Sequence, residues 1–99
     1  MFTHLAIHFP RPEYRDELRA SMRRVDAAAR ACPGIVRVDA WDESDGDRMV
    51  GIALWESREA FEASHDQVFA VVADDPFDVW CASPPDVMHL EIDGEGDGS

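Results

Sequence analysis

Residues 49–61 read MVGIALWESREAF and decide the fold. The first part, Met49 to Trp55, is rich in apolar residues and predicts a strand. Ser57 then stands where a helix N-cap belongs, and Glu59 lies in the first turn, where a carboxylate interacts favourably with the helix dipole. The segment is therefore expected to run from a strand directly into a helix.

That helix is expected to be amphipathic and to cover residues 58–73, because four mostly apolar side chains recur at helical spacing. The series consists of Phe61, His65, Val68 and Val72. Asp74-Asp75-Pro76 ends the helix. Residues 77–80 are expected to form a short helical turn or an irregular connection.

Upstream of the deciding segment, Ile35 to Trp41 is β-branched and predicts a second strand. The polar turn Asp42 to Asp47 (DESDGD) joins it to the strand 49–55, so residues 35–55 form a predicted hairpin. The turn resembles a calcium loop in composition only, since the ligand spacing and the terminal Glu are missing. We expect a solvated turn there.

The N-terminal part predicts one more strand and one more helix. Phe2 to Phe9 alternates, with Leu5, Ile7 and Phe9 on one side and histidines on the other, which is typical of a strand. Residues 13–32 predict a helix that ends at Pro33-Gly34. Its apolar stripe is Leu18, Met22, Val25, Ala29 and Cys32, while its arginines are expected to face water.

A last strand is expected over residues 87–92, which gives the order βαββαβ. This order indicates an α+β, ferredoxin-like fold, a four-stranded antiparallel sheet in the order 4-1-3-2 with two helices on one face. Residues 1–93 are expected to form this one domain, and residues 94–99 a disordered acidic, glycine-rich tail.

The strand 49–55 also predicts what lies on each side of the sheet. The small residues Gly51 and Ala53 belong under the helices, where they leave room for a cavity. Val50, Ile52 and Leu54 then face the uncovered side. Because three aliphatic side chains on a central strand would leave an exposed apolar patch, we expect a homodimer formed through this open sheet face.

Composition excludes several classes of partner. The 99 residues carry 9 Arg, no Lys and 21 acidic side chains, a net charge of −12, which argues against nucleic acid and against anionic lipid. Residues 1–37 hold seven of the arginines, whereas most acids follow in residues 38–99. No apolar run is long enough to span a bilayer, and no basic leader is visible, so a cytoplasmic protein is expected.

Two segments give a resemblance to a known family. Cys32-Pro33-Gly34-Ile35 and the block Leu54 to Phe61 resemble the antibiotic biosynthesis monooxygenase (ABM) domain, a dimeric α/β-barrel superfamily. The resemblance covers residues 2–92. It implies a substrate site between the helices and the sheet, lined by Trp55, and places the chain near cofactor-independent oxygenases of aromatic polyketides, haem-degrading oxygenases and isomerases.

The haem-degrading relatives differ from this chain at two positions. Their axial histidine falls at about Ala73 here, and their strand asparagine at about Leu5. An alanine cannot ligate iron and a leucine cannot hydrogen-bond bound oxygen, so haem degradation is not expected.

The candidate site has one catalytic residue and four substrate contacts. His65 is expected to take a proton from a phenolic substrate or to orient it, although a histidine on an apolar stripe can also serve packing alone. Trp55 is expected to stack on the substrate or to fill the core. The remaining contacts expected are Phe61, Met22 and Met49.

Three further histidines leave two alternatives open. His4, His8 and His89 belong to strands that should pair, so they could converge on a divalent metal, but the distance along a strand argues against it. The alternative is a polar stripe inside or at the rim of the dimer interface. No metal site is therefore predicted. Of the two cysteines, Cys32 is expected to be buried, and Cys81 lies in an irregular segment that could be exposed.

We expect a small ABM-type monooxygenase that acts on an aromatic or polycyclic phenolic molecule with no cofactor, neither metal nor flavin. Such chemistry requires a substrate that forms a stabilised carbanion and a site that shields it from water. The alternative is a non-catalytic, small-molecule-binding or stress-associated barrel of the same fold. An isomerase or lyase is a third option, which would need a second ionisable group near His65.

Overall fold

The structure is a computed structural model, and it describes residues 1–92. The tail expected over residues 94–99 lies outside this range. The elements, in order, are β1 (Phe2–His8), the 3-10 turn η1 (Pro12–Tyr14), α1 (Arg15–Arg30), β2 (Ile35–Asp42), β3 (Met49–Trp55), α2 (Arg58–Ala70), α3 (Phe77–Trp80) and β4 (Asp86–Glu91).

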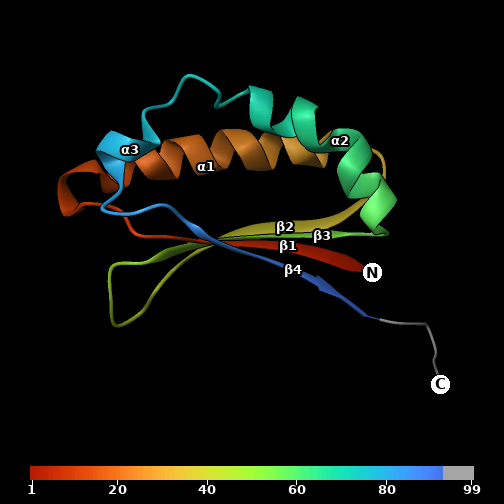
Figure 1. Ribbon diagram of the computed structural model, residues 1–99, viewed down its shortest axis with the longest axis horizontal. Helices are drawn as coiled ribbons and strands as arrows, with labels where there is room; N and C mark the ends of the chain where they lie inside the picture. The colour runs from red at the N-terminus through yellow and green to blue at the C-terminus, as the bar shows by residue number, and fades with distance from the viewer. Residues whose placement is uncertain (93–99) are drawn as a thin grey trace.

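The four strands form one antiparallel sheet in the order β2-β3-β1-β4, which confirms the predicted order. Figure 1 shows α1, α2 and α3 together on one side of this sheet and no helix on the other. The ferredoxin-like α+β architecture is therefore present. None of the helices in the described residues is long and apolar enough to cross a membrane.

Both long helices are shorter than predicted. The first begins at Arg15 rather than residue 13, because Pro12 starts a tighter 3-10 turn before it. The second begins where expected, since the Ser57 hydroxyl accepts a hydrogen bond from the Ala60 amide at 3.1 Å. It ends at Ala70, and a turn follows in which Val72 stays buried.

The core lies between the helices and the inner face of the sheet, in two clusters of buried side chains. The larger cluster joins Phe2 and Trp55 to Phe61 and Val68 of α2. The smaller cluster joins Leu18 and Met22 of α1 to Met49 and Cys81. Strand alternation then places Leu5 and Ile52, which pair directly, on the open face together with Leu54.

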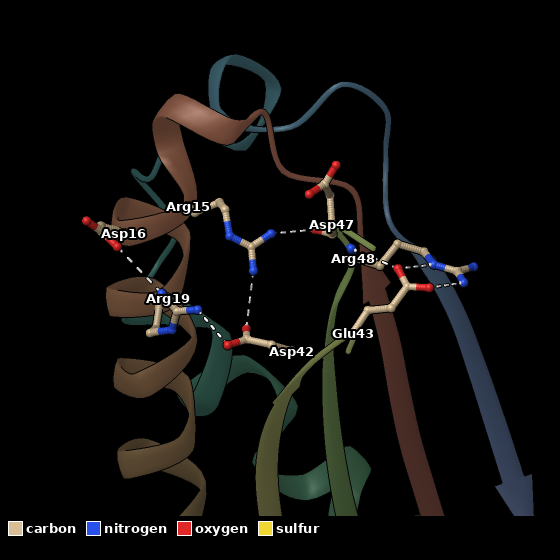
Figure 2. Close-up of polar contacts among 7 residues, drawn as sticks. All are labelled: Arg15, Asp16, Arg19, Asp42, Glu43, Asp47 and Arg48. Atoms are coloured by element: carbon tan, nitrogen blue, oxygen red, sulfur yellow. Dashed lines mark hydrogen bonds and ion pairs between the residues drawn. The ribbon is translucent and has the colours of Figure 1, made fainter. Parts of the chain in front are cut away.

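The charge asymmetry of the sequence becomes a set of ion pairs between α1 and the hairpin (Figure 2). Arg19 donates to the Asp42 carboxylate at 2.8 Å, and Arg15 donates to the Asp47 carbonyl at 2.8 Å. Within the hairpin, Arg48 and Glu43 form two side-chain hydrogen bonds of 2.9 and 2.6 Å. The turn is exposed, as expected, and in addition its acidic groups pair with arginines of α1 and of the hairpin itself.

Candidate functional site

A cavity of about 920 Å³ separates the helices from the sheet. Its floor is formed by small residues of the two central strands, Ala6, Gly51 and Ala53. Its roof comes from α1 and α2, and the segment that follows α3 closes one end. The cavity predicted over Gly51 and Ala53 is present, because glycine has no side chain and alanine only a methyl group to fill the space.

All four histidines of the chain line this cavity. His4 and His8 lie on the same face of β1 as Phe2, and His89 lies opposite His4 on β4. The open face of β1 carries Leu5 and Ile7 instead, so the histidines lie on the side of the sheet that the helices cover. The alternation of β1 contained this information, but the sequence did not show which side the helices cover.

His4 and His89 are in direct contact. Nδ1 of His4 lies 3.0 Å from Nε2 of His89, a hydrogen bond between two imidazoles. The His4 ring stacks on Phe61 with centroids 5.1 Å apart and meets the edge of Phe69 at 5.6 Å. Burial, and then the neighbouring histidines, lower the pKa of His4 to about 4, so His4 is neutral at physiological pH.

Burial also lowers the pKa of His8. The chain therefore places neutral imidazoles, which can accept protons, in a largely apolar cavity.

His65, the predicted catalytic residue, lies at the edge of the cavity with its side chain half exposed. Its Nδ1 atom is 3.1 Å from the Asp66 carboxylate. The ring packs against Phe69 and Phe61, at centroid distances of 4.8 and 5.6 Å. When Nδ1 carries the proton donated to Asp66, Nε2 is left as the free proton acceptor.

Two buried hydrogen-bond donors of the cavity have no partner. The Trp55 side chain is 2% exposed and the Ser21 side chain 1%, and neither Nε1 of Trp55 nor Oγ of Ser21 makes a hydrogen bond. Both residues line the cavity. An unpaired buried donor costs about 1–3 kcal/mol, so an oxygen-bearing ligand that accepts from either donor would be stabilised there.

Of the other predicted contacts, Phe61 and Met22 line the cavity and Met49 does not. Phe61 meets Trp55 edge to face at 6.0 Å. Met49 is 1% exposed and packs with Leu18 in the smaller core cluster. The expectation that Met49 lines the site was wrong. Met49 precedes the floor residue Gly51 by two positions on the same face of β3, where it packs under Leu18 near the start of α1.

Sequence reasoning missed Asp26, which also lines the cavity from α1. Burial raises the pKa of its carboxyl, despite the nearby Arg30. Asp26 follows Met22 by four residues, and Ser21 follows Leu18 by three, so both lie on the predicted apolar stripe. A polar residue on that stripe was the signal that would have found each of them.

The described residues contain no group of three or more side chains placed to hold a metal ion. Both cysteines are buried. The expectation that Cys81 could be exposed was wrong, because its backbone bridges to Pro10 and its side chain packs in the smaller core cluster. Burial accordingly raises the pKa of the Cys81 thiol.

The two positions compared with haem-degrading relatives both lie outside the cavity. Leu5 is on the open sheet face, where it pairs with Ile52 and Met88. Ala73 is in the turn after α2 and does not line the cavity. The position on β1 that faces the cavity at this level is His4.

Comparisons with solved structures identify the same fold at low sequence identity. Rv0793 from Mycobacterium tuberculosis is 23% identical with a TM-score of 0.82, over 97% of this chain and 98% of that one. SnoaB, a cofactor-independent oxygenase from Streptomyces nogalater, is 18% identical with a TM-score of 0.76, over 94% and 93%. MhuD, a heme degrader from Mycobacterium tuberculosis with two hemes bound in its active site, is 19% identical with a TM-score of 0.71, over 98% and 100%.

No curated protein matches the chain. The model of the antibiotic biosynthesis monooxygenase family matches residues 1–68, which include β1, α1, the hairpin and most of α2. That match spans more than half of the chain and contains both segments that carried the resemblance, so the chain belongs to the antibiotic biosynthesis monooxygenase family.

Proposed function

We propose that the protein is a monooxygenase that inserts one oxygen atom from O₂ into an aromatic or polycyclic phenolic molecule, with neither metal nor flavin. The observation that carries the proposal is the cavity of about 920 Å³ between helices and sheet. Its size lies in the range of sites for drug-sized ligands, and a few polar groups project into an otherwise apolar wall.

The reaction needs a substrate whose carbanion is stabilised by its own aromatic rings. For an aryl ketone with an acidic CH₂ group, O₂ is the oxidant: the CH₂ becomes C=O, and the second oxygen atom leaves as water with the two hydrogens. His65 would orient the substrate from the cavity edge: Asp66 accepts the hydrogen bond from Nδ1, which leaves Nε2 to accept one from the phenolic hydroxyl. The apolar wall would keep water from the carbanion.

The substrate would lie against Trp55, Phe61 and Met22. The aromatic side chains supply faces for stacking, and Met22 supplies an adaptable apolar surface. The unpaired indole N–H of Trp55 is itself buried, so it would donate to a substrate oxygen once side chains of the cavity wall move aside. Met49 supports Met22 from behind rather than touching the ligand.

We further propose that two copies associate through the open sheet face. Trp41, Met88 and Leu90 are 55%, 45% and 49% exposed in the single chain. They share that face with Leu5, Ile52 and Leu54 of the central strands. An apolar surface of this extent is typical of an interface rather than of a monomer surface.

A second candidate is a non-catalytic protein that binds a small aromatic molecule. The observation that favours it is the position of His65, whose side chain is half exposed instead of enclosed with the ligand. In that case the cavity and its donors would serve binding alone.

An oxygen-electrode assay separates the two candidates. The probe is anthrone, a tricyclic aryl ketone whose CH₂ protons are acidic and whose enol is a phenol. We expect O₂ uptake that scales with protein concentration, survives treatment with a chelator and falls in Trp55→Ala and His65→Gln. Binding of anthrone without uptake would favour the binding protein. A Soret shift at one equivalent of added hemin would contradict chemistry without haem.

A further inference from the structure

The hydrogen-bonded pair of His4 and His89 connects the inside of the cavity with solvent. His4 extends from the central strand β1, is partly buried and stacks on Phe61. His89 extends from the edge strand β4 and is exposed. The two residues face each other in the sheet register, and both line the cavity. One imidazole of the pair therefore lies toward a bound ligand and the other toward water.

Counting protons shows what such a pair can do. Two neutral imidazoles have four ring nitrogens and two N–H groups. One N–H lies in the 3.0 Å bond between Nδ1 of His4 and Nε2 of His89. The two outer nitrogens, Nε2 of His4 and Nδ1 of His89, therefore share one proton, so one of them is a donor and the other an acceptor.

We propose that His4 and His89 form a proton wire that carries the proton of an enolisable or phenolic ligand out of the cavity and back. The proposal rests on the proposed function, because it requires a ligand of that class in the cavity. It adds an activity that needs no oxygen, namely exchange of the ligand's acidic proton with water.

The step is balanced without any further reactant. Nε2 of His4 takes the ligand proton, Nδ1 of His4 passes its proton to Nε2 of His89, and Nδ1 of His89 releases its proton to water. The ligand is left as an anion, and both imidazoles remain neutral, each with its proton on the other nitrogen. Running the same step backward returns a solvent proton to the ligand.

Aromatic side chains keep the pair in place. Phe61 stacks on His4 at 5.1 Å, and Phe2 packs against His89 at 5.1 Å. On the same side of the sheet as the pair, Arg58 lies over the Phe2 ring, 4.7 Å from its centroid, and is paired with Glu91 of β4. The other groups that act on His4 are His8 of β1 and His65 of α2, both imidazoles.

The experiment measures hydrogen–deuterium exchange at the CH₂ group of anthrone, in D₂O and without oxygen, by NMR. Binding of anthrone is measured in the same samples by saturation transfer. We expect wild-type protein to speed the exchange. General acid–base groups contribute about 10²–10⁴-fold, so His4→Gln should slow the protein-dependent exchange about 100-fold. His89→Gln should slow it at least about tenfold, since an amide hydrogen-bonds but does not relay a proton.

The double variant decides whether the two residues act as a unit. If they do, His4→Gln with His89→Gln is no slower than the slower single variant. Imidazole added to the buffer should restore exchange in His89→Gln, because the lost ring is exposed, and a purely structural role would not be rescued. His8→Gln removes an imidazole from the same strand and cavity but leaves the His4–His89 hydrogen bond in place, and its exchange should stay at least about tenfold faster than that of His4→Gln.

The outcomes separate this inference from the proposed function. Exchange without O₂ uptake would support the wire and contradict the oxygenase. Binding of anthrone without exchange would overturn the wire alone. Normal exchange in His89→Gln would also overturn it, because His4 would then act by itself. Because His89 is exposed, that variant decides the question even if His4→Gln does not fold. Absence of binding would overturn both proposals.

Discussion

A Cβ atom placed on Gly34 would lie 2.6 Å from Cβ of Ala60. The loop after α1 can therefore pack closely against the first turn of α2 only because residue 34 has no side chain. Gly34 also has a φ of 85°, in the left-handed region. Its carbonyl accepts a hydrogen bond from the Glu56 amide at 2.8 Å. The two segments that carried the family resemblance are therefore in contact with each other.

Replacing Gly34 with Ala should destabilise the fold by about 2–4 kcal/mol, because the new Cβ adds a clash with Ala60 to the cost of a left-handed φ. Chemical denaturation measures the change. Gly46→Ala is the matched control: its Cβ would meet only the flexible Glu43 carboxylate, and its φ is not in the left-handed region, so it should cost under about 1 kcal/mol. Equal effects in the two variants would contradict the contact.

Replacing Ser21 with Ala should leave the ligand-free protein as stable or more stable by up to about 1 kcal/mol, because it removes a buried hydroxyl without a partner. The same change should weaken anthrone binding about 2–10-fold, if the hydroxyl donates to a ligand oxygen. Ser64→Ala in α2 controls for the helix propensity of alanine, since Ser64 is buried but lies outside the cavity lining. A clear loss of stability in Ser21→Ala would show that the hydroxyl has a partner.

The free energy of unfolding should decrease as the pH is lowered from 6.5 toward 4, because of the partly buried imidazole of His4. In the fold the pKa of His4 is lowered from 6.5 to about 4, so in this window the unfolded chain binds the proton and the folded chain does not. The fold keeps its full stability with respect to His4 above pH 6.5, and it loses that contribution as the pH approaches 4. At ~1.4 kcal/mol per pKa unit, the loss is on the order of 3 kcal/mol.

Denaturation midpoints measured at several pH values test this. His4→Gln should flatten the dependence between pH 6.5 and 4, although His8 keeps part of it because burial lowers its pKa as well. An unchanged slope in His4→Gln would contradict the assigned pKa.

The fold could be predicted from the sequence because local signals and long-range packing agree in it. The N-cap at Ser57, the stop at Gly34 and the alternation of β1 each fix one element. The site was harder to predict, since it depends on which face of β1 the helices cover. Period-two alternation places His4 and His8 together but does not say on which side of the sheet.

The same limit explains the error at Met49 and the omission of Asp26. Periodicity places Met49 on the helix-covered face of β3 and Asp26 on the inner stripe of α1. Which of these side chains borders the cavity depends on how far each helix turn lies from the sheet. The bond between His4 and His89 joins residues 85 positions apart in the chain, and it depends on the register of β1 with β4. No local pattern encodes that register.

A single charge on the open sheet face should separate the proposed dimer. Leu5 lies in the middle of that face, between Ile52 and Met88, and does not line the cavity. Leu5→Glu would place a carboxylate in an apolar interface, where burying it without a partner is strongly unfavourable. We expect light scattering to give twice the 11.1 kDa chain mass for wild type and the chain mass for Leu5→Glu.

Val71→Glu is the control for this experiment. It places the same charge on an exposed apolar residue of the helix layer, at the end of α2, and should leave the dimer intact. The melting temperature of wild type should rise with protein concentration, because association stabilises the folded state, whereas that of Leu5→Glu should not. A wild-type mass equal to the chain mass at micromolar concentration would contradict the dimer, because the open face would then remain exposed to water in solution.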